Sequence, residues 1–352
     1  MIGLILLGTV AGGGVWLLDA SIDPAEEASR LAPVDRAMIA GVRSWGYQLQ
    51  RLDVAQVAGT PLDLVVVDET LDGHRRPASV QRTLSSLKQK PDSGRRLVLS
   101  YMSIGEAEDY RPYWRPDWVA SAGPNAAAPG LSDLANLAAP PARANVRFVV
   151  PGSLQPLRGP SKSAPAWLGE ENAEWRGNYR VRFWHPDWQR QMFGQKGAAL
   201  DRIIAAGFDG IYLDRADVHE TWRGEQPTAK ADMVQFIERL AAYARQQRPG
   251  FLVVMQNAEE LLALPAVRRS LDAVAKEDFL FGADVEGQPN STKDVDATLR
   301  YLKMARGDGL PVMVVEYLAD TQTAALARKQ LEGLGFVPYF APRRLNALGN
   351  AG

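Results

Sequence analysis

The chain has 352 residues, of which 46% are hydrophobic and 23% charged, with 40 basic against 41 acidic side chains. This is the composition of a folded globular protein, and a net charge of −1 gives no electrostatic reason to expect a nucleic acid or an anionic membrane surface as a partner. The sequence contains no cysteine, which excludes disulfides, thiolate catalysis and cysteine-ligated zinc or iron–sulfur sites.

The beginning of the chain is apolar. Residues 2–18 contain no charged side chain, and the run stops at Asp19. Such a run is typical of a signal peptide or a signal anchor, although no Lys or Arg precedes it and its length is marginal for a membrane span. A buried N-terminal helix is the alternative. We expect residues 1–20 to direct export, so that the protein is periplasmic, secreted or anchored in a membrane through its N-terminus.

Further along, short apolar runs alternate with stretches of helical spacing. Nine runs are candidate strands, at residues 44–50, 63–68, 96–102, 179–184, 209–214, 251–257, 272–278, 311–317 and 336–341. Helical spacing is found at residues 78–89, 188–206, 229–247, 293–306 and 321–334. Runs such as LVVV are apolar at every position, which predicts strands buried on both faces of a parallel sheet.

This alternation predicts an α/β fold. A (β/α)8 barrel of the TIM type over residues 36–345 fits better than a doubly wound open sheet, because no glycine-rich nucleotide turn follows the first or second run. Nine candidate strands are one more than the barrel needs. Residues 121–165 are rich in Pro, Ala, Gly and Ser and predict a long insertion between the third and fourth candidates, either a solvated loop or a lid.

Acidic side chains recur where the candidate strands end, which is where a barrel builds its active site. Asp214 and Glu277 end apolar strands directly. Glycoside hydrolysis needs two carboxylates, one to protonate the leaving oxygen and one to attack or to activate water. We therefore expect Asp214 and Glu277 to be catalytic. The alternative for either acid is a helix cap or an ion pair with a neighbour such as Arg215 or Lys276.

Other polar and aromatic residues near the strand ends are candidate substrate-binding groups, because sugar faces stack on aromatic rings and sugar hydroxyls bond to carboxylates and amides. Among the aromatic residues, we expect at least one of Tyr101, Trp114 and Trp184 to be a sugar platform. The full set of candidate substrate-binding residues is Tyr47, Asp68, Tyr101, Glu106, Trp114, Trp184, Tyr212, Asp217, Asn257, Glu259 and Glu316.

Other catalytic motifs are weak. Asp217, His219 and Glu220 are close in sequence, but the H-E-x-x-H spacing of zinc hydrolases is absent, so we expect no metal and no cofactor. Ser103 precedes Gly105 without the G-x-S-x-G elbow of serine hydrolases.

Five segments of the sequence, in order, resemble the bacterial branch of glycoside hydrolase family 114, typified by endo-α-1,4-polygalactosaminidase. They are LVLSYMSIGEAEDYRPYW (97–114), WLGEENAEWRGNYRVRFWHPDWQ (167–189), GFDGIYLDRADVHE (207–220), VVMQNAEEL (253–261) and AVAKEDFLFG (273–282). The resemblance covers about residues 42–345.

The resemblance implies a (β/α)8 barrel that acts on polymers of α-1,4-linked galactosamine or N-acetylgalactosamine. It carries the catalytic acids onto Asp214 and Glu277, and we expect Asp214 to be the nucleophile and Glu277 the general acid/base of a retaining mechanism. A polymer with free amines is cationic, so an acidic rim would attract it. The alternative function is a non-catalytic carbohydrate-binding barrel, or a scaffold in a polysaccharide export or biofilm system.

We predict that residues 1–20 are absent from the mature protein or embedded in a membrane, because their apolar run has no polar face to present to water. N-terminal sequencing of protein taken from its native cell measures this. A freely soluble protein that begins at Met1 would contradict the prediction.

Overall fold

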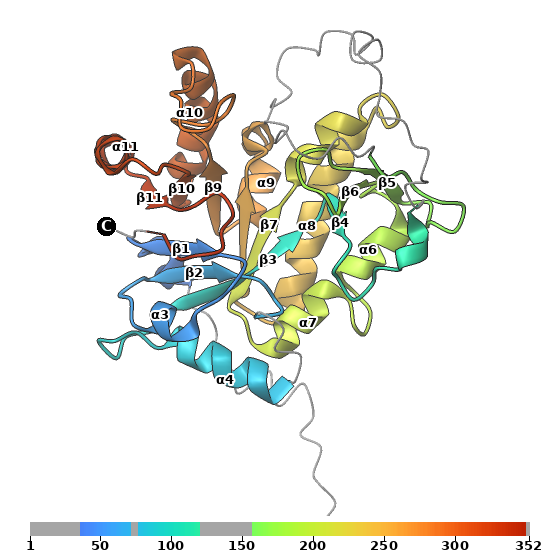
Figure 1. Ribbon diagram of the computed structural model, residues 1–352, viewed down its shortest axis with the longest axis horizontal. Helices are drawn as coiled ribbons and strands as arrows, with labels where there is room; N and C mark the ends of the chain where they lie inside the picture. The colour runs from blue at the N-terminus through green and yellow to red at the C-terminus, as the bar shows by residue number, and fades with distance from the viewer. Residues whose placement is uncertain (1–35, 72–76, 120–156, 350–352) are drawn as a thin grey trace, which may run out of the picture. The chain divides into compact units, whose positions relative to one another are not determined.

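A computed structural model describes residues 36–71, 77–119 and 157–349. Its centre is an eight-stranded sheet with the order β1-β2-β3-β7-β8-β9-β10-β11, in which all neighbours are parallel. The sheet curls into a nearly closed barrel (Figure 1). Its strands are β1 (Trp45–Gln48), β2 (Leu64–Val67), β3 (Leu97–Ser103), β7 (Gly210–Asp214), β8 (Leu252–Gln256), β9 (Ala273–Glu277), β10 (Val312–Glu316) and β11 (Val337–Phe340).

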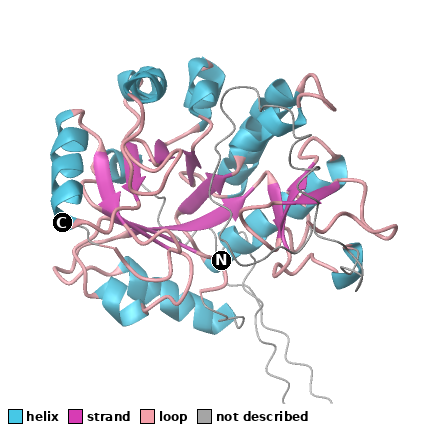
Figure 2. Ribbon diagram, turned by 45° about the horizontal axis from the view of Figure 1, so that its top comes forward, coloured by secondary structure: helices cyan, strands magenta, loops and turns pink. Residues whose placement is uncertain are grey.

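Helices connect the strands and surround the sheet (Figure 2), which confirms the predicted (β/α)8 barrel. Several begin at a side-chain cap: Asp53, Ser291 and Asp320 accept hydrogen bonds from backbone N–H groups in the first turn. The α-helices are α2 (Arg36–Ala40), α3 (Val54–Ala58), α4 (Pro77–Lys88), α6 (Pro186–Met192), α7 (Ala199–Ala206), α8 (Ala229–Gln247), α9 (Pro265–Ser270), α10 (Thr292–Gly307) and α11 (Thr321–Gly333). The 3₁₀ turns are η1 (Pro116–Trp118), η2 (Ala216–Trp222) and η3 (Glu259–Ala263).

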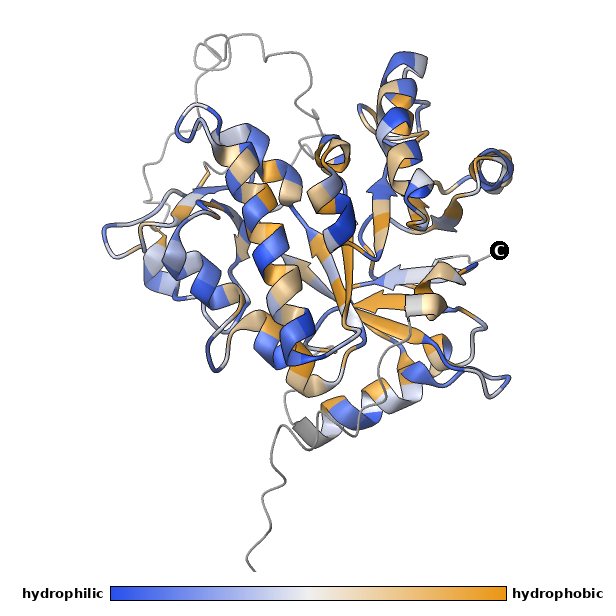
Figure 3. Ribbon diagram, turned by 180° about the vertical axis from the view of Figure 1, so that it is seen from behind, coloured by the Kyte–Doolittle hydropathy of each residue, from blue (hydrophilic) through white to orange (hydrophobic). Residues whose placement is uncertain are grey.

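The barrel strands are buried on both faces, and their residues alternate between two separate apolar clusters. One cluster fills the barrel interior and includes residues such as Tyr212, Val254 and Ala275. The other lies between the strands and the helices and includes their neighbours Leu213 and Met255. Side chains two residues apart on a strand share a face. The strands are accordingly almost uniformly apolar, whereas the helices mix apolar and polar positions (Figure 3).

The first and last barrel strands meet through side chains. The indole of Trp45 on β1 donates to the backbone oxygen of Val337 on β11 at 3.0 Å, and the hydroxyl of Tyr339 donates to the backbone oxygen of Tyr47 at 3.5 Å. The rings of Trp45 and Tyr339 lie 5.4 Å apart. Aromatic packing therefore closes the interior between β1 and β11.

One of the nine candidate strands, residues 179–184, belongs to a second sheet. The interpretation of residues 179–184 as one of the barrel series is wrong, because β6 (Asn178–Val181) pairs antiparallel with β4 (Glu106–Glu108) and β5 (Leu168–Glu171), whereas β3 pairs directly with β7. This small sheet lies beside α6, apart from the barrel strands (Figure 1). It is built from the long connection between the third and fourth barrel strands.

The predicted helix over residues 188–206 is two helices, α6 and α7. The break falls between Met192 and Ala199, where Gly194 and Gly197 adopt φ values of 86° and 87°. Glycine has no Cβ and takes this left-handed conformation at little cost, so these residues interrupt the helical pattern.

Two sequence predictions lie wholly or largely outside the described residues. The export segment at residues 1–20 is one, and most of the insertion at 121–165 is the other. Within the described part of the chain, none of the helices combines the length and apolar character that a membrane crossing requires.

Three aspartates fix the strands at the N-terminal end of the barrel. Each stands directly before a strand and accepts a hydrogen bond from the backbone at the start of the preceding strand in the sheet: Asp63 from Ser44, Asp209 from Val98 and Asp272 from Val253. A basic side chain pairs with each carboxylate, namely Lys90, Lys88 and Arg245 respectively. The three pairs therefore fix the register of β1 with β2, β3 with β7, and β8 with β9.

We predict that Asp209→Asn lowers the free energy of unfolding by about 3 kcal/mol, because it removes the counter-charge of the buried Arg248 and of the largely buried Lys88. The Asp209 carboxylate is fully buried and contacts Lys88 at 2.8 Å and Arg95 at 2.7 Å. Denaturant unfolding measures the change. Glu170→Gln is the control, since Glu170 is 67% exposed in its pair with Arg180, and should change stability by less than about 1 kcal/mol. Equal effects of the two variants would contradict the prediction.

Candidate active site

Two carboxylates share one amide at the C-terminal end of the barrel. Asp214 ends β7, Gln256 ends β8 and Glu277 ends β9, and each lies two residues beyond an interior residue of its strand. The Nε2 atom of Gln256 donates to Asp214 Oδ1 and to Glu277 Oε2, at 2.9 Å in both cases. The two acceptor oxygens therefore lie within twice 2.9 Å of each other.

A tyrosine in the barrel interior fixes the orientation of the Gln256 amide. The hydroxyl of Tyr212, on β7, donates to Gln256 Oε1. Since the oxygen of the amide is held in this way, its NH₂ group points toward the carboxylates. The ring of Tyr212 packs against that of Tyr47 at a centroid distance of 5.1 Å, and both side chains are buried in the barrel interior. Tyr47 and Tyr212 thus form the floor beneath the carboxylates.

Further donors hold the outer oxygens of the pair. The hydroxyl of Tyr101, on β3, donates to Asp214 Oδ2 at 2.9 Å. The hydroxyl of Tyr317, which follows β10, donates to Glu277 Oε1, and the Asn257 amide donates to Glu277 Oε2 at 3.0 Å. We call Asp214, Glu277, Gln256, Tyr101 and Tyr317 the carboxylate network. Five barrel strands or strand ends contribute to it.

The two acids repel each other when both are charged. Burial and the charge of Glu277 raise the pKa of Asp214 to about 7, against the opposing attraction of Arg215. Interacting acids of this kind titrate as a unit. The pair therefore retains one proton over a pH range in which isolated carboxyl groups are ionised.

The residue after each of these strand ends has a left-handed backbone. Arg215, Asn257 and Asp278 adopt φ values of 64°, 57° and 51°. This conformation is uncommon for residues other than glycine, and such residues cluster at functional sites because the surrounding structure must hold them. Here Asn257 bonds to Glu277, and Asp278 pairs with Arg343 at 2.8 Å. The chain turns away sharply and leaves Asp214, Gln256 and Glu277 at the mouth.

The turn after Asp214 packs against the end of β3. A Cβ added to Gly105 would lie 2.1 Å from the backbone oxygen of Arg215, so only glycine fits there. Arg215 pairs with Glu106 at 3.1 Å and with Asp217 at 3.5 Å. Asn172 also donates to Glu106 at 2.8 Å. Glu106 and Asp217 therefore lie around the Arg215 guanidinium, and Glu106 is buried.

Asp68 is neutralised in the structure. Arg111 contacts Asp68 at 2.8 Å, Glu69 at 3.6 Å and Glu108 at 2.6 Å. Asp68 and Glu108 are buried with this guanidinium. The acidic rim expected from the sequence is thus weaker than the count of carboxylates suggested, because an arginine and its acids form a buried cluster on the β2 and β3 side.

Two of the predicted aromatic platforms pack mainly against other aromatic side chains. The ring of Trp114 stacks on Tyr179 at 4.6 Å, and that of Trp184 packs edge-on against Trp222 at 5.4 Å. Both are partly buried against the outer apolar cluster. Tyr101, by contrast, lies in the carboxylate network. Of the three, Tyr101 is the one that directly contacts a predicted catalytic acid.

Glu259 and Glu316 lie apart from the carboxylate network. Glu316 occupies an outward position of β10, is fully buried, and accepts hydrogen bonds from the backbone of Leu280 and Phe281. Glu259 accepts a hydrogen bond from Thr298 of α10 and lies 3.8 Å from Lys276. Both acids hold connections in place, and Glu316 has no exposed surface with which to contact a sugar.

The sequence analysis missed Gln256 and did not include Tyr317 among the site residues. Gln256 precedes Asn257, which was selected, and both fall at the end of the run VVMQN. Alternate side chains of a strand lie on the same face, and this rule identifies Gln256. Because Val254 faces the barrel interior, Gln256 faces it as well. The same spacing places Tyr317 on the inner side, two residues beyond Val315.

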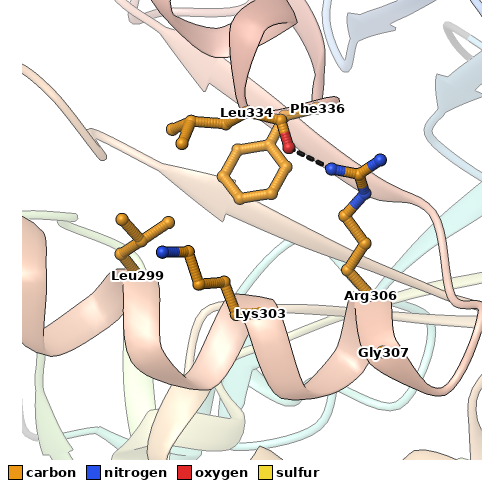
Figure 4. A pocket seen from close by; sticks show the side chains of 6 residues that line it. All are labelled: Leu299, Lys303, Arg306, Gly307, Leu334 and Phe336. Atoms are coloured by element: carbon orange, nitrogen blue, oxygen red, sulfur yellow. Dashed lines mark hydrogen bonds between the residues drawn. The ribbon is translucent and has the colours of Figure 1, made fainter.

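A groove on the outside of the barrel is separate from this site. It has a volume of about 310 Å³ and lies between α10 and the segment that leads into β11 (Figure 4). Lys303 and Arg306 line it beside the ring of Phe336, and Arg306 donates to the backbone oxygen of Leu334. None of its lining residues belongs to the carboxylate network.

Known sequences resemble the chain over most of its length. A family model described as glycoside-hydrolase family GH114 matches residues 128–351, a range that contains both carboxylates. An uncharacterized protein of Methanocaldococcus jannaschii is 30% identical over 313 residues, which cover 84% of this chain and 75% of that protein. An uncharacterized protein of Deinococcus radiodurans is 29% identical over 334 residues, which cover 94% of this chain and 90% of that protein.

Two solved structures share the fold. The glycoside hydrolase domain of PelA from Pseudomonas aeruginosa has a TM-score of 0.54 and 21% identity, with coverage of 88% of this chain and 99% of that one. Ega3 of Aspergillus fumigatus, in complex with galactosamine, has a TM-score of 0.54 and 17% identity, with coverage of 87% of this chain and 94% of that one. At this level of identity the similarity supports the barrel fold.

We predict that Asp214→Asn raises the melting temperature at pH 8 and has a smaller effect at pH 4. The raised pKa of Asp214, about 7, means that its carboxyl contributes stability below the unfolded pKa of about 4 and loses it as the pH rises through about 7. Asparagine does not ionise and escapes this loss. Its oxygen can still accept from Gln256, and its NH₂ can donate to Tyr101.

Thermal unfolding at the two pH values measures the difference. Asp308→Asn is the control, because the side chain of Asp308 is 47% exposed beside Arg268 and its removal should have a similar small effect at both pH values. A stabilisation by Asp214→Asn that does not depend on pH would contradict the assignment of a raised pKa to this residue.

Proposed function

The chain belongs to glycoside-hydrolase family GH114, as its resemblance to that family predicted, and it is a glycoside hydrolase. We propose that Asp214 and Glu277 cleave bonds within a polysaccharide of α-1,4-linked galactosamine or N-acetylgalactosamine. The observation that carries the proposal is the single amide of Gln256 bonded to both acids. A binding barrel without turnover has no need to hold two carboxylates so close together, since their repulsion destabilises the site.

The spacing of the acids favours a retaining mechanism. Carboxyl groups in retaining enzymes lie about 5 to 5.5 Å apart, and those in inverting enzymes about 6.5 to 9.5 Å apart, to leave room for a water. The acceptor oxygens of Asp214 and Glu277 lie within twice 2.9 Å of each other. In the proposed reaction, one acid attacks the anomeric carbon while the other protonates the leaving oxygen. The second acid then activates the water that releases the sugar.

We assign Asp214 as the nucleophile and Glu277 as the general acid/base, following the family resemblance. The pKa of Asp214 is raised to about 7 beside Glu277, so the pair holds a proton that Asp214 must not carry when it attacks. The assignment therefore requires the proton to reside on Glu277 once a sugar is bound.

The proposed substrate class is galactosamine-type, and the complex of the similar fungal Ega3 with galactosamine supports it. A free amine is a cation, and the carboxylates near the barrel mouth without a close arginine partner are the groups to attract it. Asp68 and Glu106 contribute less than expected because they pair with Arg111 and Arg215. Export through residues 1–20 is part of the same proposal, since a polysaccharide of this kind is met outside the cytoplasm.

We predict that Asp214→Asn and Glu277→Gln each lower the turnover of such a polymer by about 10² to 10⁴-fold or more, because each removes a bond-making or proton-transferring group. Release of reducing ends from partly deacetylated α-1,4-galactosaminan measures this. Glu332→Gln is the matched control: it makes the same carboxylate-to-amide change on α11, at a side chain that is 57% exposed beside Arg328, and should retain near wild-type turnover. Near wild-type turnover by both test variants would show that the acids only bind.

The order of the two acids has its own measurement. With azide and an activated glycoside, loss of the nucleophile in Asp214→Ala should give a glycosyl azide of inverted configuration, and loss of the acid/base in Glu277→Ala one of retained configuration. The reverse pair of products would exchange the two roles while leaving the catalytic pair intact.

A further inference from the structure

A second group of possible ligands lies beside the active-site loops. His219 is in η2, which follows β7, and Glu260 is in η3, which follows β8. His219 Nε2 lies 3.2 Å from Glu260 Oε1. Among the described residues, however, both atoms are buried and neither meets the geometry of a hydrogen bond with any partner. Glu220 adds a third ligand atom, and the three atoms lie within 4.8 Å of one another.

The contacts of the imidazole suit a ligand role. His219 Nδ1 lies 2.9 Å from the backbone oxygen of Ala216, so that nitrogen carries a hydrogen and donates it. In the neutral ring, Nε2 is then an acceptor that faces a carboxylate oxygen, and two acceptors 3.2 Å apart are stabilised by a positive species between them, which is either a proton or a metal cation. A backbone carbonyl that holds the other ring nitrogen is the usual arrangement around a metal-bound histidine.

We propose that His219, Glu220 and Glu260 bind a divalent cation of the zinc class. Zinc takes imidazole nitrogen and carboxylate oxygen at about 2.0 to 2.2 Å with tetrahedral geometry, which places neighbouring ligand atoms about 3.3 Å apart. The distance of 3.2 Å between His219 Nε2 and Glu260 Oε1 is close to this separation of neighbouring ligand atoms. The inference goes beyond the glycosidase function and does not depend on it.

The charges around the site set its affinity. Glu220 and Glu260 supply two negative charges, which favour a divalent cation. Arg223 opposes it, since it pairs with Glu220 at 2.8 Å, and the charge of Lys230 also acts on Glu260. Glu220 is 45% exposed, so it can release Arg223 and turn to a cation that enters from solvent, with water completing the coordination.

The cation has a structural role in this proposal. It joins the loop that follows Asp214 to the loop that follows Gln256, two residues of the carboxylate network. His219 and Glu260 contact neither catalytic acid in any hydrogen bond described above. The cation should therefore stabilise the barrel mouth, and its chemistry is not part of bond cleavage.

The competing explanation is a direct ion pair between a protonated His219 and ionised Glu260. Burial disfavours the charged imidazole, whereas the close contact with the Glu260 carboxylate favours it, and the net effect raises the pKa of His219. An ion pair needs no metal. The two explanations differ in whether the folded protein takes up zinc and in whether its stability responds to zinc.

The test is zinc binding to the full, chelator-treated protein. We expect isothermal titration to give one equivalent of zinc per chain, and zinc to raise the melting temperature. Cobalt should give the visible absorption bands of a tetrahedral site. His219→Ala should abolish all three. His185→Ala is the matched control, because His185 caps α6 through Asp187 and lies outside the cluster, so it should retain zinc binding.

Glu220→Gln covers the case in which His219→Ala does not fold, since Glu220 is on the surface, and it should weaken zinc binding at least tenfold. The proposal is overturned if the wild-type protein takes up no zinc, or if zinc binding is unchanged in Glu220→Gln and in a folded His219→Ala. Equal loss of binding in His185→Ala would also overturn it, because the metal would then lie elsewhere.

Discussion

Asp214 and Glu277 lie close together at the mouth of the barrel, and two carboxylates at this distance repel each other when both are ionised. One neutral amide donates hydrogen bonds to both carboxylates and holds them in place despite this repulsion. Gln256 donates to both acids from the strand between them, and Tyr212 fixes which way the amide points. Because the donor is uncharged, it holds both oxygens without cancelling the repulsion that raises the pKa of Asp214. An arginine in the same place would bind both acids more strongly, but it would also lower their affinity for the proton that catalysis needs.

The acids around the central pair have different partners from the central pair itself. Arginines pair with the acids outside the centre, Arg111 with Asp68 and Arg215 with Glu106, whereas Asp214 and Glu277 are bonded by tyrosines and amides. The outer acids are therefore paired with arginines, whereas the central pair is held by neutral donors. Such a contrast between neighbouring environments is how one protein keeps one carboxyl protonated and another ionised at the same pH.

The sequence predicted the barrel and the two central acids because both depend on local patterns. Uniformly apolar runs identify strands buried on both faces, and the residue that ends such a run lies at the mouth. Residues 179–184 were misplaced because a short alternating run has the same local pattern in a barrel or in an accessory sheet. The pairing of Asp68 with Arg111 and the outward position of Glu316 depend on tertiary contacts. Gln256 was missed because the neighbouring Asn257 was chosen as the amide at the strand end, whereas the alternation of side chains along β8 places Gln256 on the interior face.

The aspartates at the opposite end of the barrel bear on the chemistry as well. Asp209 stands directly before β7 and Asp272 directly before β9, and each bonds to the strand that precedes it in the sheet. Side chains on a strand alternate between faces, so a slip of a single residue in register turns every one of them over. After such a slip, Asp214 or Glu277 would point toward the helices, and Leu213 or Lys276 would take its place at the mouth. A protein with intact strands and helices would then have no pair of carboxylates at the mouth of the barrel. Asp209 and Asp272, at one end of the barrel, therefore determine which side chains face the mouth at the other end.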